Sequence, residues 1–283
     1  MEIKKITVFA NTDNPNVRAT SQEMKKYFSS LGKSVSVISL SGTSADYEIK
    51  APEADFAISL GGDGTVLTCA VILENTEIPL MAVNKGSFGY ITEVSVTEYK
   101  EVFKDFEEGK AKLQKRLMLS AEIVRGGKVI KEYSALNDIV VSASSRAKLA
   151  HLNLSINHTL ASTLKADGIV VASPTGSTAY SLSAGGPVLE PNLSGIVINP
   201  ISPFSMSVRP LIVSDDAEIE IAIPIQKADI IITADGHNVF ELVQDDVVVI
   251  KKHLSDAVFV ENRRRNFIEV LRDKLGWAGG LNA

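Results

Sequence analysis

Short apolar runs, separated by polar and glycine-containing segments, organise the first 112 residues. Four runs have the length of buried strands and occupy residues 3–10, 34–40, 56–60 and 80–83. Helical spacing of apolar side chains predicts helices at residues 17–31, 66–73 and 99–106. The apolar face of the first of these helices is Val17, Met24, Phe28 and Leu31. Strands that alternate with helices in this way favour a doubly wound, mostly parallel sheet.

After about residue 112 the pattern changes to short strands with little helix. Candidate strands occupy residues 118–124, 128–136, 149–156, 159–164, 169–172, 195–199, 218–223, 230–234, 247–250 and 258–260. A final helix at residues 267–275, with Ile268 and Leu271 on one face, is expected to pack back on the first domain. We therefore expect an α/β plus all-β fold. Residues 1–112 form its α/β domain, joined by 263–283, and residues 113–262 form its β-rich domain.

The stretch 167–187 begins as a strand that is apolar on both faces and then becomes rich in small and hydroxyl residues. Pro174 ends the strand because it has no backbone N–H to donate. Small residues let a ligand approach the backbone, hydroxyls offer hydrogen bonds, and Tyr180 offers a flat ring face. Ser177 is placed to cap a short helix through Tyr180 and Ser183. A binding loop is favoured over the alternative, an ordinary Ser/Thr-rich surface loop.

The run Gly61-Gly62-Asp63-Gly64-Thr65 lies between the third strand and a helix start. Glycines in that position let backbone N–H groups surround phosphate oxygens, and the helix terminus adds partial positive charge. The run lacks the Lys-Ser/Thr pair of a Walker A loop and the spacing of the dinucleotide-binding fingerprint. A carboxylate among glycines is able to accept a proton from a hydroxyl or to hold Mg²⁺. The alternative is that Asp63 is a plain turn residue.

Composition narrows the possibilities further. The chain has 283 residues, of which 45% are hydrophobic and 22% charged, as in ordinary globular proteins. A net charge of −5 gives no sign of a general nucleic-acid binder. The single cysteine, Cys69, lies in an apolar run, excludes an internal disulfide and fits a reducing compartment. Neither a signal peptide nor an apolar run of the ~20 residues that a membrane helix needs is present, so a cytoplasmic protein is expected.

The glycine run resembles the nucleotide-binding motif shared by NAD kinases, diacylglycerol and sphingosine kinases and, more loosely, 6-phosphofructokinases. The stretch 167–187 resembles a second signature of the NAD kinases that the lipid kinases lack. Leu136-Asn137-Asp138, the loop from Gly86 to Gly89, and Arg209-Pro210-Leu211-Ile212-Val213 also follow that family's order. The resemblance covers roughly residues 55–240. It implies phosphorylation of the 2′-hydroxyl of the adenosine ribose of NAD, with ATP and a divalent metal that is expected to be Mg²⁺.

The resemblance implies that Asp63 is the catalytic base and that a further set of residues binds the nucleotides. Asn137 and Asp138 match the pair that hydrogen-bonds adenosine and ribose groups, and Asp167 matches a carboxylate near the nicotinamide half. The whole implied set is Gly61, Gly62, Gly64, Thr65, Tyr90, Asn137, Asp138, Lys148, Lys165, Asp167, Thr178, Ala179, Tyr180, Ser183 and His237.

Four of these positions also have a structural interpretation that does not involve a ligand. Asn137 would be a strand-end cap, and Lys148 and Lys165 would be solvated lysines. His237 stands where many members have Gln, and a lone histidine is more often structural. Tyr90 stands in Gly-Tyr-Ile where Gly-Phe-Leu is common, which keeps an aromatic face.

Two other functions remain open at this point. A lipid kinase of the diacylglycerol type would share the glycine run, and a non-catalytic NAD sensor would share the fold. The four histidines do not pair at zinc-site spacing, so no protein metal site is expected. The expected partners are the small molecules NAD and ATP, with neither nucleic acid nor membrane. The resemblance also implies a homodimer or homotetramer, for which the β-rich half is the favoured interface.

Overall fold

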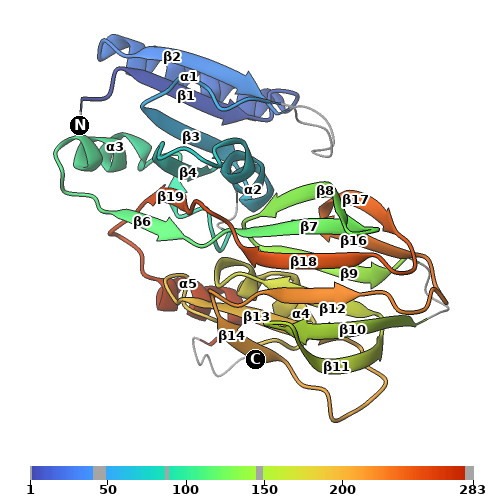
Figure 1. Ribbon diagram of the computed structural model, residues 1–283. Helices are drawn as coiled ribbons and strands as arrows, with labels where there is room; N and C mark the ends of the chain where they lie inside the picture. Colours follow the sequence, from blue (N-terminus) through green and yellow to red (C-terminus); the bar gives the residue numbers. More distant parts are fainter. Residues whose placement is uncertain (1, 41–48, 87–88, 145–148, 278–283) are drawn as a thin grey trace. The chain divides into compact units, whose positions relative to one another are not determined.

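The structure, a computed structural model, describes residues 2–40, 49–86, 89–144 and 149–277. The chain divides into two compact units (Figure 1). Unit 1 contains the described parts of residues 1–43, 49–115 and 257–283, and unit 2 contains those of 116–256. Each unit is therefore considered on its own.

Unit 1 is built on a seven-stranded sheet. Its strands are β1 (Lys5–Ala10), β2 (Ser34–Ser39), β3 (Phe56–Gly61), β4 (Leu80–Asn84), β5 (Val94–Ser95), β6 (Leu113–Arg116) and β19 (Ala257–Val260). The order is β2-β1-β3-β4-β19-β6, with β5 beside β4. The pairs β1–β2, β1–β3, β3–β4, β4–β5 and β4–β19 are parallel. The parallel sheet expected from the alternating pattern is confirmed.

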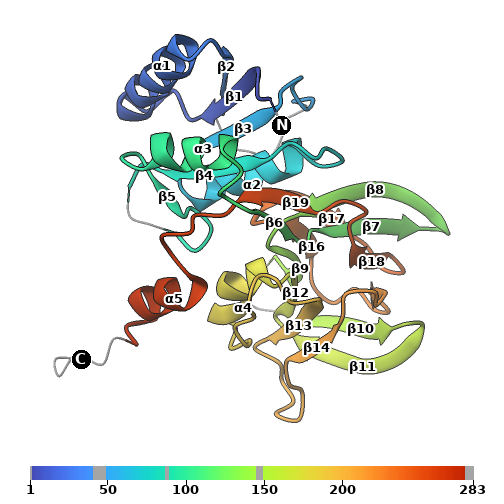
Figure 2. The ribbon, with the colours of Figure 1, turned by 90° about the vertical axis from the view of Figure 1, so that its left-hand side faces the viewer.

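Helices cover both faces of this sheet. The helices on the sheet are α1 (Pro15–Ser30), α2 (Asp63–Ile72) and α3 (Tyr99–Glu107), and unit 1 also contains α5 (Phe267–Leu275). Phe28 of α1 and Phe103 of α3 meet with ring centroids 4.8 Å apart, in one buried cluster with Met81 and Val83. Figure 2 shows α1 beside β1 and β2. The helix α2 lies over the other face. Its Ala70 lines a small cavity with Leu80 of β4. Leu80 points to the opposite face from Met81, because successive side chains of a strand alternate between the two faces.

Local sequence explains where these helices begin and end. The Asn14 side chain caps α1 by accepting from the Asn16 N–H, and Pro15 stands in the first turn, where no N–H is required. Gly32 takes a φ of +79° beyond the end of α1. Leu31 is 47% exposed, so its expected place on the buried face was wrong. The reason is that the helix ends at Ser30 and Leu31 is its C-cap.

The carboxyl-terminal segment also departs from expectation. The strand at 257–260 was grouped with the β-rich half, but β19 pairs with β4 in the sheet of unit 1. The final helix has the expected bounds and begins with a reciprocal capping box between Asn266 and Glu269. Leu271 is buried, whereas Ile268 is 64% exposed, so only one of the two expected face residues packs.

Unit 2 consists of two six-stranded antiparallel sheets. The first has the order β11-β10-β15-β18-β7-β8, formed by β7 (Leu119–Arg125), β8 (Lys128–Ala135), β10 (Ala150–Ile156), β11 (Thr159–Ala166), β15 (Ile219–Ala222) and β18 (Val247–Lys252). The second has the order β14-β13-β12-β9-β16-β17, formed by β9 (Asp138–Ala143), β12 (Gly168–Ala172), β13 (Gly195–Ile201), β14 (Leu211–Ser214), β16 (Ile230–Ala234) and β17 (His237–Leu242). Strands β9, β14 and β17 were missing from the sequence prediction.

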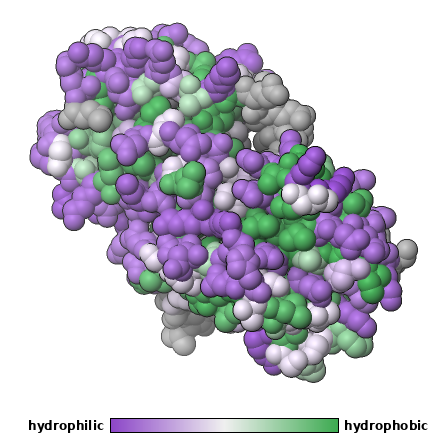
Figure 3. Space-filling view, in the orientation of Figure 1, coloured by the Kyte–Doolittle hydropathy of each residue, from purple (hydrophilic) through white to green (hydrophobic). Residues whose placement is uncertain are grey.

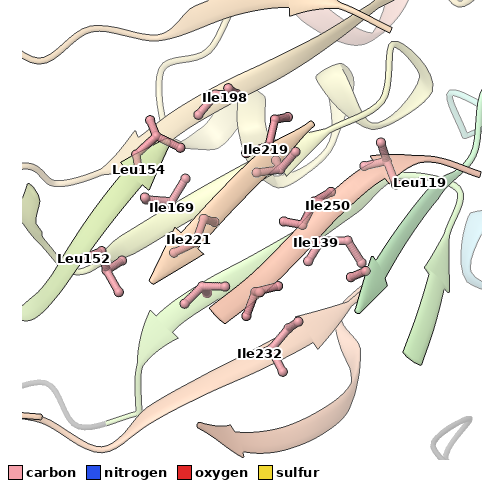
Figure 4. Close-up of a cluster of buried hydrophobic side chains, with 14 of the residues drawn as sticks. Leu119, Ile139, Leu152, Leu154, Ile169, Ile198, Ile219, Ile221, Ile232 and Ile250 are labelled. Atoms are coloured by element: carbon pink, nitrogen blue, oxygen red, sulfur yellow. The ribbon is translucent and has the colours of Figure 1, made fainter. Parts of the chain in front are cut away.

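Isoleucine, leucine and valine side chains from both sheets form the core of unit 2 (Figure 4). Ile139 and Ile169 come from the second sheet, and Ile219 and Ile250 come from the first. Buried and less buried positions alternate along β7, β15 and β16, as a half-buried sheet requires. Strand β12 is buried at every residue, as its uninterrupted apolar sequence predicts.

The surface seen in Figure 3 is mostly hydrophilic, with smaller hydrophobic patches between the polar side chains. Among the described residues, no helix combines the length and the apolar character that crossing a bilayer requires.

Cys69 is fully buried in α2, where burial raises the pKa of its thiol, as expected for a core residue rather than a nucleophile.

The position of Ile250 in the core leads to a stability prediction. Ile250→Ala should lower the free energy of unfolding by about 2–5 kcal/mol, because it removes buried methyl groups and leaves a cavity. Leu160 in β11 is 60% exposed, so Leu160→Ala should cost less than about 1 kcal/mol. Urea unfolding followed by circular dichroism measures both, and equal losses would contradict the core assignment of Ile250.

Candidate functional site

Asp63 is the first residue of α2, and the loop after β4 holds its carboxylate. Oδ2 accepts a hydrogen bond from the Tyr90 backbone N–H at 2.8 Å. Oδ1 accepts from the N–H groups of Ile91 at 3.3 Å and Thr92 at 3.1 Å, and from the Thr92 hydroxyl at 3.0 Å. Among the described residues, Oδ1 is therefore fully engaged, whereas Oδ2 has one partner and keeps a lone pair. Asp63 therefore begins a helix and its carboxylate accepts four hydrogen bonds, which does not fit the alternative of a plain turn residue.

Thr92 is the centre of this arrangement, and sequence reasoning missed it. Its hydroxyl accepts from the Asn84 side-chain amide at 2.9 Å and from the Gly89 N–H at 2.9 Å, and it donates to Asp63. Asn84 in turn accepts from the Gly86 N–H at 2.5 Å. Hydrogen bonds thus connect the end of β4, Gly86, Gly89 and the start of α2.

Two glycines are required here by close approach. A Cβ on Gly89 would overlap the Asp63 carboxylate, and a Cβ on Gly61 would overlap the Thr65 side chain. Gly62 and Gly64 are exposed at the start of α2, and a helix start leaves backbone N–H donors that an anion can use. The N–H groups of Thr65 and Val66 already donate to the Gly62 carbonyl at 3.0 and 3.4 Å.

The position within the sheet is also informative. Strand β1 is flanked by β2 on one side and β3 on the other, so the strand order reverses between β1 and β3. The glycine run follows the carboxyl end of β3, beside that reversal. Ligands of open parallel sheets bind at such switch points. Tyr90 borders the same place, and its partial burial, together with the charge of Asp63, raises the pKa of its phenol.

In unit 2, Asp235 holds the segment that contains Asn137 and Asp138. Its Oδ2 accepts from the Leu136 N–H at 2.8 Å, and its Oδ1 accepts from the N–H groups of Asn137 at 2.7 Å and Asp138 at 3.1 Å. The Asp235 N–H donates back to the Asp138 carbonyl at 2.9 Å. Asp235 was not a sequence candidate, because its three partners lie about a hundred positions away in the chain.

Asp138 is nearly buried, and its titration is displaced. Desolvation first and the neighbouring Asp235 charge second raise the pKa of Asp138 to about 7, against the lowering effect of a hydrogen bond from the Tyr180 backbone N–H. Burial also raises the pKa of Asp235, which its three backbone donors and the nearby His237 oppose. The two carboxyl groups form a coupled pair that holds a proton at higher pH than separate carboxyls would.

The loop after β12 is more buried than its composition suggests. It forms a 3₁₀ turn (Thr175–Thr178) and the short helix α4 (Tyr180–Ser183). Ser177 had been expected to cap that helix, but the N-cap residue is Ala179. The Ser177 hydroxyl instead donates to the Pro174 carbonyl at 2.7 Å and accepts from the Leu189 N–H at 2.9 Å. The alternative of an ordinary surface loop is excluded by the burial of the 3₁₀ turn.

Four buried polar atoms in or beside this loop lack a hydrogen-bond partner among the described residues. They are Asn137 Oδ1, Thr175 Oγ1, Ser181 Oγ and Asn199 Oδ1. A buried polar atom left unpaired is costly, so such atoms mark places where a further group is missing. Among the described residues, the Asn137 oxygen therefore takes no part in the strand-end cap that was considered for this side chain.

The remaining candidates occupy different places. Tyr180 and Ser183 are exposed, Ala179 is half-buried and Thr178 is buried, all in or beside the short helix. Lys165 and Asp167 are exposed at the opposite end of β12 from Asp138. A strand of that length, with five residues, spans ~17 Å. Lys148 lies outside the described residues.

The structure also gathers one group that the sequence did not suggest. His158, Glu218 and Glu220 bring their ligand atoms within 4.8 Å of one another on unit 2, whereas no metal-ligand cluster had been expected. His158 Nδ1 lies 2.7 Å from a Glu220 oxygen, and Lys251 already pairs with Glu218 at 2.6 Å. These contacts account for the group as an ion-pair cluster.

Comparison with known families matches both halves of the chain. Residues 2–111 match the ATP-NAD kinase N-terminal domain, and residues 136–262 match the ATP-NAD kinase C-terminal domain. Among curated relatives, an NAD kinase from Treponema denticola is 39% identical over 278 residues, covering 98% of each chain. One from Geotalea daltonii is 34% identical over 282 residues, covering 97% of this chain and 99% of the relative.

Solved structures agree with these matches. Yeast NADH kinase in complex with NADH has a TM-score of 0.85 and 25% identity, covering 99% of this chain and 89% of that chain. An NAD kinase from Archaeoglobus fulgidus in complex with ATP has a TM-score of 0.76 and 27% identity, covering 97% of this chain and 100% of that chain. With both domain models matched and relatives above 30% identity over nearly the full length, the chain belongs to the ATP-NAD kinase family.

Proposed function

We propose that this protein is an NAD kinase, a phosphotransferase that moves the γ-phosphoryl group of ATP to the 2′-hydroxyl of the adenosine ribose of NAD. The observation that carries the proposal is the Asp63 carboxylate, fixed beside glycines at a helix start and a sheet switch point. Family membership supports the same activity.

In this proposal Asp63 is the general base. A ribose hydroxyl is a weak nucleophile until its proton is accepted. Oδ2, with its free lone pair, takes that proton while the 2′-oxygen bonds to the γ-phosphorus. The bond from the γ-phosphorus to the bridging oxygen breaks, and ADP leaves with that electron pair. Oδ1, engaged by Ile91 and Thr92, keeps the carboxylate in place.

Backbone N–H groups of the glycine run stabilise charge on the transferring phosphoryl group. Mg²⁺ usually keeps several waters and is bound largely through substrate phosphates. Because Oδ1 of Asp63 is engaged and Oδ2 takes the proton, the phosphates of ATP would hold the ion in this proposal. When bound with ATP, Mg²⁺ would neutralise phosphate charge.

Unit 2 supplies the dinucleotide-binding residues of this proposal. The unpaired Asn137 Oδ1 is suited to accept from an adenosine N–H or O–H group, and Asp138 is suited to accept from ribose hydroxyls. Asp167, at the other end of β12, is suited to face the nicotinamide half. The spacing of the two ends fits an extended dinucleotide.

Two alternatives were open from the sequence, a lipid kinase and a non-catalytic NAD sensor. The lipid kinase is disfavoured because the family match extends over residues 136–262, the half that carries the NAD signature. The sensor is disfavoured because Asp63 and its donors are intact. Incubation of the purified protein with Mg-ATP and NAD, followed by enzymatic detection of NADP, distinguishes an NAD kinase from both alternatives, and absence of NADP would refute the proposal.

We further infer a homo-oligomer assembled through unit 2. Strand β14 is an edge strand whose Leu211 and Ile212 are 46% and 47% exposed. Phe204 and Met206, in the preceding loop, are 79% and 85% exposed. Exposed apolar side chains beside an unpaired strand edge favour association with another chain.

The general-base assignment predicts a specific kinetic loss. Asp63→Asn should lower kcat by ~10²-fold or more, with little change in NAD affinity, because the amide accepts no proton. Gly89→Ala should also lower kcat, since its Cβ would displace the carboxylate. Steady-state kinetics and calorimetry measure both effects, and near-wild-type turnover of Asp63→Asn with intact NAD binding would remove the assignment.

Tyr180 is 45% exposed, so a ligand can reach its side chain. If it packs on bound NAD, Tyr180→Ala should weaken NAD binding by about 1–2 kcal/mol, the scale of an aromatic contact. Tyr180→Phe is the matched control and should keep most of the affinity. A dissociation constant unchanged in the Ala variant would show that the ring does not bind the substrate.

The exposed Asp167 predicts a preference between redox forms. The nicotinamide ring is cationic in NAD⁺ and neutral in NADH, so a nearby carboxylate favours NAD⁺ by roughly 1–2 kcal/mol. Asp167→Asn should shrink the preference, and Lys165→Ala should not. The measurement is kcat/KM for both forms in the three proteins, and equal ratios in wild type and Asp167→Asn would exclude the interaction.

A further inference from the structure

The Asp235 carboxylate receives three consecutive backbone N–H groups, those of Leu136, Asn137 and Asp138, at 2.8, 2.7 and 3.1 Å. Asp235 is the first residue of the two-residue turn between β16 and β17, where Ala234 pairs with His237. It takes a φ of +51°, followed by Gly236 at +73°, as a primed hairpin turn requires.

The turn therefore connects two groups of nucleotide-binding candidates. One is the Asn137–Asp138 pair, bound through its backbone, and the other is His237, which follows the turn directly. The Asp235 N–H also donates a hydrogen bond to the Asp138 carbonyl at 2.9 Å, so the turn and the segment are bonded in both directions. A shift of the Asp235 carboxylate would consequently move these candidate contacts together.

We propose that Asp235 is a positioning residue for NAD, because it fixes the Asn137–Asp138 segment through three backbone hydrogen bonds. The inference rests on the proposed function and adds a residue that acts through others. Asp235 holds its neighbours and does not itself contact the reacting atoms.

A carboxylate is required because all three partners are donors. Both oxygens of Asp235 accept, whereas an amide would present its own N–H₂ to at least one backbone N–H. Hydrogen bonds to an ionised acceptor are also stronger than neutral ones. Asp235→Asn should thus loosen the segment and weaken NAD binding about tenfold or more.

The charge of Asp235 gives a second effect that a structural role would not. Asp138 faces the Asp235 carboxyl and the Tyr180 N–H, and Asp235 faces His237 and its three backbone donors. The raised pKa of Asp138, about 7, means that the group is protonated below neutral pH and ionised above it. NAD affinity should therefore rise with pH through about 7, as Asp138 becomes able to accept from ribose hydroxyls.

Removing the Asp235 charge should move that inflection to lower pH, because a neighbouring anion no longer opposes ionisation of Asp138. Asp235→Glu keeps the charge and displaces the carboxylate, so it should lose affinity and keep an inflection closer to that of the wild type. The two variants thereby separate charge from geometry, and Asp235→Glu keeps the test decisive if Asp235→Asn folds poorly.

The experiment is calorimetric titration of the full chain with NAD from pH 6 to 8.5, for wild type, Asp235→Asn and Asp235→Glu. Asp245→Asn is the matched control, because Asp245 is an exposed aspartate with a positive φ of +66°. Asp246→Asn is the stability control, because Asp246 is buried and pairs with Arg125 at 2.8 Å. Neither control should move the inflection.

A tenfold or larger loss of affinity in Asp235→Asn, with the inflection shifted to lower pH, supports the inference. Unchanged affinity, an unshifted inflection, or a loss equal to that of Asp246→Asn would overturn it. Wild-type protein that neither binds nor phosphorylates NAD would instead refute the proposed function, so the two failures are distinguishable.

Discussion

The constraint on which both units depend is the need to pair backbone N–H groups in loops at the ends of strands. Each unit meets it in the same way, with one aspartate that accepts from three consecutive N–H groups. Asp63 accepts from residues 90–92, and Asp235 accepts from residues 136–138. An ionised carboxylate is the side chain best suited to this task, because it has two oxygens and no donor.

This arrangement connects folding with the proposed chemistry. In unit 1 the loop donors occupy Oδ1 of Asp63 and leave Oδ2 available, so the bonds that fix the carboxylate also select the proposed proton acceptor. In unit 2 the burial of Asp138 and the neighbouring charge of Asp235 raise the pKa of Asp138. The structural carboxylate of Asp235 and the proposed ligand-binding carboxylate of Asp138 are therefore coupled, and a change in the charge of one changes the pKa of the other.

The rigid surroundings of these loops explain why small shifts would matter. The parallel sheet of unit 1 fixes the end of β3, and the isoleucine-rich core between the sheets of unit 2 fixes β9, β12 and β16. Glycines at Gly61, Gly89 and Gly176 allow contacts that a Cβ would prevent. Preorganised donors and acceptors on a packed scaffold are what binding and catalysis require.

The sequence by itself determined the features that depend on local pattern: the parallel sheet, most strands of the β-rich half, the bounds of α5 and the glycine run at the end of β3. Only the tertiary structure decided the contacts between distant positions. Thr92 and Asp235 carry no local signal, since their partners lie elsewhere in the chain. The short strand β19 joined the first sheet because strand pairing depends on three-dimensional neighbours, which hydrophobic periodicity does not record.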